Sequence, residues 1–179
     1  MSILQYYYKK IIRRDLINKF SYTYLEEIPQ LKKIILNFGC KNSDIRSIAS
    51  VFLSLDLITT QKSFIARSKR ANVLLKIRRG NPVGCTVVLR NEKMYHFLFK
   101  LLSEVLPNLK SFTSMNVSKK LGKTSFSFTL KDLIHFKELE KQFYLFINLP
   151  PLNVTFITTT KTKEELLYLL QSFKLALIF

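Results

Sequence analysis

Residues 59–90 constrain the fold most, because they hold β-like segments joined by a turn. The sequence TTQKSFIARSKRANVLLKIRRGNPVGCTVVLR predicts a strand, a basic loop, a strand that ends near Arg78, a turn at Gly80–Pro82 and a third strand through Arg90. Proline has no N–H to donate to a sheet, so Pro82 fits a turn and not the middle of a central strand. This region is therefore expected to form paired strands.

Segments with strand and helix patterns follow one another along the rest of the chain. Strands are expected at 30–40, 124–130 and 152–161, and TSFSFTL in the second of them alternates Phe with small polar residues. Helices are expected at 2–20, 45–58, 91–109 and 163–173, where apolar residues recur every three or four positions. This order predicts an α+β fold in two layers, with a mainly antiparallel sheet, helices packed on one face and the other face open. The length predicts a single domain over 1–179, with a basic loop at about 66–83.

Three of the predicted helices have a proposed buried face, which in the helix at 91–109 consists of Met94, Phe97, Leu98, Leu101, Leu102 and Val105. In the first helix, Ile3, Tyr7, Ile11 and Phe20 are expected to face the core, with Leu4 and Ile17 at the edges and with Lys9, Lys10, Arg13 and Arg14 largely on the other faces. In the second helix, the buried stripe is expected to be Ile45, Ile48, Val51, Phe52, Leu55 and Ile58.

Charge limits the classes of partner. The chain carries 29 Lys and Arg against 12 Asp and Glu, a formal net charge of +17 over 179 residues. Two spans contain no acid, one between Asp56 and Glu92 and one between Glu104 and Asp132. The cations of the first span are Lys62, Arg67, Lys69, Arg70, Lys76, Arg78, Arg79 and Arg90, and those of the second are Lys110, Lys119, Lys120, Lys123 and Lys131. Solvated surfaces usually mix both signs, so the pattern predicts a polyanionic partner.

RNA is the polyanion that the sequence favours. No helix-turn-helix, basic zipper or zinc-finger pattern is present to enter a DNA major groove, and polar residues on an open sheet face suit the shallow minor groove of RNA. No run of 18 apolar residues predicts a membrane span. The apolar end LLYLLQSFKLALIF fits a core-facing helix as well as an interfacial one, so a peripheral membrane protein stays an alternative.

Catalytic and cofactor sites are not predicted. The LGKTS at 121–125 lacks the earlier glycine of a phosphate-binding loop, since residue 117 is Val, and it leads into a strand instead of a helix. His96 and His135 do not have metal-site spacing to Cys40 or Cys85, so no metal is expected. The two cysteines are expected to be reduced, buried thiols. We expect no enzyme and no cofactor.

Several blocks resemble, in order and spacing, the bacterial-type L-five family of large-subunit ribosomal proteins. They are KKIILNFG (32–39), the whole of 59–90, the helix that follows, FKELE (136–140) and NVTFITTT (153–160), and the most specific is the turn at 77–85. The resemblance runs from the first helix to the last. It implies a structural protein that binds 5S rRNA with the open sheet face, helps to form the central protuberance, reaches P-site tRNA with a basic loop, and bridges to a small-subunit head protein.

The resemblance also implies roles for individual residues. The expected rRNA-binding residues are Asn37, Gln61, Lys62, Thr86 and Arg90, together with Lys119, Lys120 and Lys123 of the second acid-free span. The expected tRNA-facing loop residues are Arg67, Lys69, Arg70, Lys76, Arg78 and Arg79. Thr86 and Val88 stand where the family usually has Lys and Thr, and FTSM (112–115) replaces Phe-Arg-Gly-Leu.

These departures and the scarcity of glycine suggest an organellar member. We expect it to lie in the ribosome of the mitochondrial matrix and to be made inside that organelle, with another organelle or a bacterial cytoplasm as alternatives. The expected partners are 5S and large-subunit rRNA, P-site tRNA, neighbouring central-protuberance proteins and a small-subunit head protein, with no membrane and no homo-oligomer. A free-standing RNA-binding module in RNA processing is the alternative function.

Overall fold

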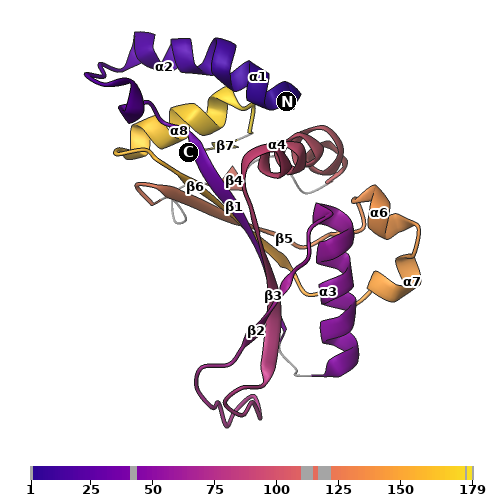
Figure 1. Ribbon diagram of the computed structural model, residues 1–179. Coiled ribbons are helices and arrows are strands. Elements are labelled where there is room, and N and C mark those ends of the chain that lie inside the picture. Colours follow the sequence, from indigo (N-terminus) through magenta and orange to yellow (C-terminus); the bar gives the residue numbers. More distant parts are fainter. Residues whose placement is uncertain (1, 41–43, 110–114, 117–121, 176, 179) are drawn as a thin grey trace. The chain divides into compact units, whose positions relative to one another are not determined.

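The computed structural model describes residues 2–40, 44–109, 115–116, 122–175 and 177–178 of the chain (Figure 1). The strands are β1 (Leu31–Gly39), β2 (Phe64–Arg67), β3 (Pro82–Leu89), β4 (Met115–Asn116), β5 (Ser125–Leu130), β6 (Leu152–Thr158) and β7 (Leu177–Ile178). The helices are α1 (Ile3–Tyr7), α2 (Arg13–Lys19), α3 (Ile45–Thr59), α4 (Asn91–Lys100), α5 (Leu106–Asn108), α6 (Lys137–Glu140), α7 (Phe143–Phe146) and α8 (Lys163–Ser172). Two π-helical turns, η1 (Tyr8–Ile12) and η3 (Leu101–Val105), and one 3₁₀ turn, η2 (Leu25–Glu27), complete the order.

Five strands form one sheet in the order β2-β3-β1-β6-β5, and β2 and β3 pair antiparallel. All the strands expected outside the loop region are present. Buried residues alternate along them with half-exposed or exposed ones, which gives the sheet a covered face and an open face. The predicted α+β fold is confirmed. The short parallel pair of β4 and β7 was not predicted from the sequence.

The chain forms two compact units. Unit 1 comprises Met1–Ile34, Leu89–Phe128 and Thr155–Phe179, and unit 2 comprises Ile35–Val88 and Thr129–Val154. β1, β3, β5 and β6 each contribute residues to both units. The assignment of 1–179 to a single domain stays a prediction.

The N-terminal helix of unit 1 buries a different face from the one predicted. Ile3 is 73% exposed and Ile11 46% exposed, whereas Tyr8, Ile12 and Leu16 are buried. The buried residues are four positions apart, a spacing that drifts around an α-helix of 3.6 residues per turn. The π-helical turn at 8–12 adds a residue to one turn and so keeps them in line. A 3.6-residue pattern could not identify this face.

The core of unit 1 includes a cluster of three phenylalanines on adjacent strands. Phe126 and Phe128 of β5 lie with ring centroids 6.5 Å and 5.7 Å from that of Phe156 on β6. All three side chains are buried, while the intervening Ser127 and Thr155 are half-exposed and share a hydrogen bond of 3.0 Å. The alternation read from TSFSFTL is confirmed.

In unit 2, α3 buries four of the six residues predicted for its apolar stripe, namely Ile48, Val51, Leu55 and Ile58. Phe52 is only half-buried, and Ile45 at the first turn is 84% exposed. The helix ends at Thr60, which takes the left-handed conformation.

The start of β2 is fastened to α3 by Ser63. The backbone N of Ser63 donates to the Asp56 carboxylate (2.7 Å), and its hydroxyl donates to the Phe52 carbonyl (3.4 Å). These two bonds fix the point at which the chain leaves the helix and enters the sheet.

The predicted strand ending near Arg78 is wrong. Residues 68–81, all of them described, form a loop whose ladder is limited to one isolated bridge between Asn72 and Ile77. The apolar run at 73–75 has β-like composition but no neighbouring strand to pair with. The Asn72 carboxamide oxygen accepts from the backbone N of Leu74 (3.0 Å) and, more weakly, from that of Leu75 (3.4 Å), which favours a turn there.

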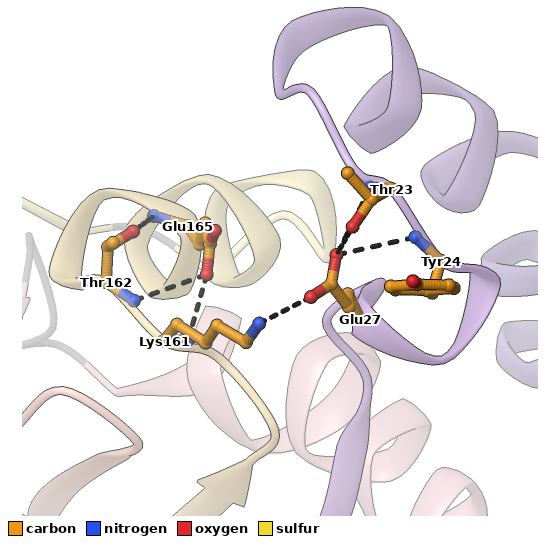
Figure 2. A network of polar contacts seen from close by, with 6 residues as sticks. All are labelled: Thr23, Tyr24, Glu27, Lys161, Thr162 and Glu165. Atoms are coloured by element: carbon orange, nitrogen blue, oxygen red, sulfur yellow. Dashed lines mark hydrogen bonds and ion pairs between the residues drawn. The ribbon is translucent and has the colours of Figure 1, made fainter.

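A network of polar contacts holds the approach to β1 against the start of α8 in unit 1 (Figure 2). The Lys161 ammonium donates to one Glu27 carboxylate oxygen (2.7 Å), and the hydroxyl of Thr23 donates to the other (2.9 Å). Thr162 and Glu165 form a capping box that begins α8, and the Glu165 carboxylate also accepts from the backbone N of Lys161 (2.9 Å). The hydrogen bond from Lys161, followed by that from Thr23, lowers the pKa of Glu27 to about 2.

This shift predicts a pH-dependent contribution to stability. Because the pKa of Glu27 falls from 4.5 to about 2 on folding, its contribution is complete above pH 4.5 and is lost as the pH falls towards 2. The measurement is the free energy of unfolding in urea between pH 6 and pH 2.5. Wild type should exceed Glu27→Gln at pH 6, and the difference should shrink on acidification. Glu26→Gln is the charge-matched control, and an equal, pH-independent loss in both variants would contradict the assignment.

The backbones of β3 and β1 approach closely at Gly84. A Cβ added at this position would overlap the carbonyl oxygen of Phe38, which is backbone and cannot move aside as a side chain can. A Cβ added at Gly39, one residue after Phe38, meets no atom within 4 Å. The two glycines therefore have opposite tolerance of a methyl group.

We predict that Gly84→Ala destabilises the protein by about 1–3 kcal/mol or more, because the strands must separate to admit the methyl group. Gly39→Ala should be neutral or stabilise by up to about 1 kcal/mol, because it restricts the unfolded chain without a clash. Urea unfolding of both variants tests this. Equal effects of the two substitutions would show that the β1–β3 contact is not the cause.

Candidate nucleic-acid interface

The open face of the sheet in unit 2 carries uncharged polar groups, together with the half-exposed Ile35 and Val88, in place of a solvated mixture of charges. Asn37 of β1 is half-exposed between the buried Leu36 and Phe38, and Thr86 of β3 is half-exposed between Cys85 and Val87. Towards the other edge, Thr129 of β5 donates a hydrogen bond to the side-chain oxygen of Asn153 on β6 (2.8 Å). The strands thus present hydroxyls and amides that suit the grooves of RNA.

One aromatic residue on this face was missed in the sequence. Phe64 pairs directly with Thr86 across the β2–β3 ladder, so the two side chains project from the same side. Phe64 is 67% exposed. Its place on this face follows from the strand pairing, in which Ile65 lies opposite the buried Cys85, and that pairing is not visible in the sequence. An exposed ring beside polar groups can stack on a base.

Gln61 and Lys62 are adjacent in the sequence but have different environments. The Gln61 side-chain amide donates to the carbonyl of Val88 (3.2 Å), so this side chain braces β3. The Lys62 side chain is exposed, with no ion pair among the described residues, next to the fastened Ser63. The structure places Lys62 beside the start of β2, where it can meet a phosphate near the open face of unit 2.

The other predicted rRNA residues belong to unit 1 or lie outside the described residues. Arg90 is exposed and is the N-cap residue of α4, and Lys123 is exposed just before β5. Lys119 and Lys120 lie outside the described residues. Arg90 and Lys123 therefore belong to a different unit from Asn37, Lys62, Phe64 and Thr86.

The predicted tRNA-facing cations gather around one loop. Figure 1 shows this loop at the end of the β2–β3 hairpin in unit 2. Its base is closed by hydrogen bonds from Ser68 N to the Asn81 carbonyl (2.8 Å) and from Gly80 N to the Ser68 carbonyl (2.9 Å). Gly80 has a φ of +89°, which favours glycine. The exposed cations around this base and loop are Arg67, Lys69, Arg70, Lys76, Arg78 and Arg79.

The tip of this loop is apolar, which the charge pattern did not reveal. Val73 and Leu74 are 90% and 93% exposed. Ile77, by contrast, is buried and anchors the part of the loop that returns towards β3. The loop therefore offers aliphatic groups at its end and cations along its sides.

The reactive groups to be considered are the cysteine thiols and the candidate metal ligands. Burial, followed by the neighbouring Cys40 and Asp56, raises the pKa of the Cys85 thiol to about 11, so that thiol is neutral and unreactive. Cys40 is half-buried rather than buried, and both cysteines are free. Over the described residues, no cluster of His, Cys, Asp and Glu could hold a metal ion, and no helix is long and apolar enough to cross a membrane.

Comparison with known proteins identifies relatives along nearly the whole chain. A family model for the C-terminus of the ribosomal L5 family matches residues 82–177. The large ribosomal subunit protein uL5m of Reclinomonas americana is 37% identical over 99% of this chain and 98% of its own length. The uL5 proteins of Nitrosomonas europaea and Thermosipho melanesiensis are 33% and 34% identical, over 97% and 93% of this chain and 97% and 91% of their own lengths.

Proposed function

Because the chain belongs to the uL5 family of large-subunit ribosomal proteins, we propose that it binds 5S rRNA with the open face of its sheet and contacts P-site tRNA with its basic loop. Family membership makes it a structural constituent of the large subunit and not an enzyme, as predicted. Its partners are accordingly rRNA and ribosomal proteins. We propose in addition which RNA each surface binds and which residues make the contacts.

The observation that carries the 5S rRNA proposal is the composition of the open face in unit 2. Asn37 and Thr86 supply hydrogen-bonding groups, Phe64 supplies a stacking surface, and Lys62 supplies a cation at the margin. Helical RNA displays 2′-hydroxyls and base edges in a wide, shallow minor groove, and its unpaired bases stack on exposed rings. A sheet face of this kind fits a folded RNA better than a bare phosphate backbone.

The loop supports the tRNA part of the proposal. It places six exposed cations on a hairpin end with no acidic residue between Asp56 and Glu92, so its approach to a phosphate backbone meets little repulsion. Closure at Ser68, Gly80 and Asn81 limits the conformations that binding must restrict. We also propose that the protein contacts neighbouring central-protuberance proteins and a small-subunit head protein.

We also propose a mitochondrial location, with the protein working in ribosomes of the matrix. The support is the mitochondrial relative of Reclinomonas americana, whose identity of 37% spans 99% of this chain. The charge of +17 suits a protein that works on a polyanion in that compartment.

A paired substitution experiment separates the two proposed RNA surfaces. Asn37→Ala with Lys62→Ala should weaken binding of purified 5S rRNA by at least about tenfold and lower the salt slope by about 0.7 for the lost cation. Arg78→Ala with Arg79→Ala should leave 5S rRNA binding within about twofold and weaken tRNA binding in the P site of reconstituted ribosomes. Gln61 is left intact because its side chain braces β3.

The matched control is Asn148→Ala with Lys141→Ala, which removes one amide and one cation from exposed positions elsewhere in unit 2. It should bind both RNAs like wild type. If the loop pair abolished 5S rRNA binding while the sheet pair did not, the proposed division of the surface would be wrong.

Phe64 allows a test that does not depend on charge. Phe64→Ala should weaken 5S rRNA binding by at least about fivefold with an unchanged salt slope, because base stacking is worth about 1–3 kcal/mol and releases no counterion. Phe64→Tyr keeps the ring and should bind like wild type. Equal loss in both variants would exclude stacking as the role of this ring.

A further inference from the structure

The outer face of the N-terminal helix in unit 1 has an ordered row of side chains. Figure 1 shows α1, η1 and α2 as one continuous helix. Its buried residues Tyr8, Ile12 and Leu16 follow one another at intervals of four. Lys10 lies midway between Tyr8 and Ile12, and Arg14 lies midway between Ile12 and Leu16, so both are about 200° around the helix from the buried residues, on the opposite face. Tyr6 and Asn18 continue the same spacing of four at either end. The row Tyr6, Lys10, Arg14 and Asn18 is exposed throughout.

This outer row combines the groups that RNA-binding surfaces use. Tyr6 is 59% exposed and offers an aromatic face, Lys10 and Arg14 are cations, and Asn18 carries a hydrogen-bonding amide. Among the described residues, no ion pair is seen for Lys10 or Arg14. Lys19 differs, because its ammonium lies 4.0 Å from the ring centroid of Tyr168 on α8.

The charge of the helix argues for a polyanion. From Ile3 to Lys19 it holds five cations, Lys9, Lys10, Arg13, Arg14 and Lys19, against one acid, Asp15. The helix is also outside the two acid-free spans that drew attention in the sequence. The inner face already has its partners, since α1 packs on α4 and α2 on α8. The outer row is therefore left for a ligand, and its cations need one that is anionic.

We propose that the row Tyr6, Lys10, Arg14 and Asn18 is a second RNA-binding surface, which contacts the large rRNA of the subunit. Lys10 and Arg14 hold phosphates, Tyr6 stacks on an unpaired base, and Asn18 bonds to a sugar or base edge. The exposed aliphatic residues Ile3, Ile11 and Ile17 flank the row, and a protein partner that covers them is one outcome of the test below. This surface lies on other elements than the sheet face and does not depend on that proposal.

The test is binding of the full-length chain to the large rRNA extracted from its own subunits, measured over a range of KCl concentrations. Lys10→Ala with Arg14→Ala should lower the salt slope by about 1.4, which corresponds to about tenfold weaker binding at 0.15 M salt. Tyr6→Ala should weaken binding by at least about fivefold at an unchanged slope, and Tyr6→Phe should restore it.

The matched control is Lys141→Ala with Lys163→Ala, which removes two exposed cations that have acidic neighbours, Glu140 and Glu164. It should leave the slope unchanged. If the helix pair behaved like this control, the inference would be overturned. Thermal unfolding checks that the variants fold, and Lys10→Gln with Arg14→Gln, which keeps much of the length of both side chains without their charge, replaces the alanine pair if that pair does not fold.

The outcomes also separate this inference from the proposed function. Helix variants that lose the large rRNA but keep 5S rRNA support the helix surface whatever the sheet variants do. Sheet variants that keep 5S rRNA would contradict the proposed function and leave this inference standing. Helix variants that bind the large rRNA normally but wash out of purified subunits would indicate a protein partner and overturn it.

Discussion

The close passage of β3 against β1 at Gly84 is the constraint on which the rest of unit 2 depends. With no Cβ at this position, the backbone of β3 approaches the carbonyl of Phe38, and Cys40 N then donates to the Val83 carbonyl (2.9 Å). That pairing sets the register in which Thr86 reaches the open face and Cys85 the covered one. Since β2 pairs with β3, it also fixes Phe64 and the base of the basic loop. A contact without charge thereby positions the charged surface.

Local patterns predicted the fold where a segment has one buried face and ordinary geometry. The period of two in TSFSFTL identified Phe126 and Phe128 as buried, and the spacing in α3 identified Val51 and Leu55. The pattern failed in the N-terminal helix, because a π-helical turn changes the period and no residue type announces such a turn. It failed again at 73–75, where β-like residues have no strand to pair with. Both failures come from tertiary context, which outweighs propensity.

The candidate interface was only partly accessible to the sequence. Counting charges located the basic loop, because an acid-free span needs no structure to be seen. The charge count could not show that the Gln61 side chain donates a hydrogen bond to the Val88 carbonyl or that Phe64 projects beside Thr86, because both depend on how the chain pairs in the sheet. It also passed over the outer helix row, because Asp15 among the five cations keeps the helix outside the acid-free spans. Which side of an element a charge occupies is information that composition does not hold.

The π-helical turn at 8–12 also has a consequence for the length of the chain. Each residue of an α-helix turns the backbone by about 100°, so the loss of one residue from this turn would relax it to an ordinary α-helix. The flanking turns would keep their faces, because the wide turn completes one revolution with one residue more than an α-helical turn. A deletion between Ile12 and Leu16 would instead turn one flank against the other by about 100° and take Lys10 and Arg14 out of line. The helix should therefore tolerate the loss of one residue within 8–12 better than the loss of one after it.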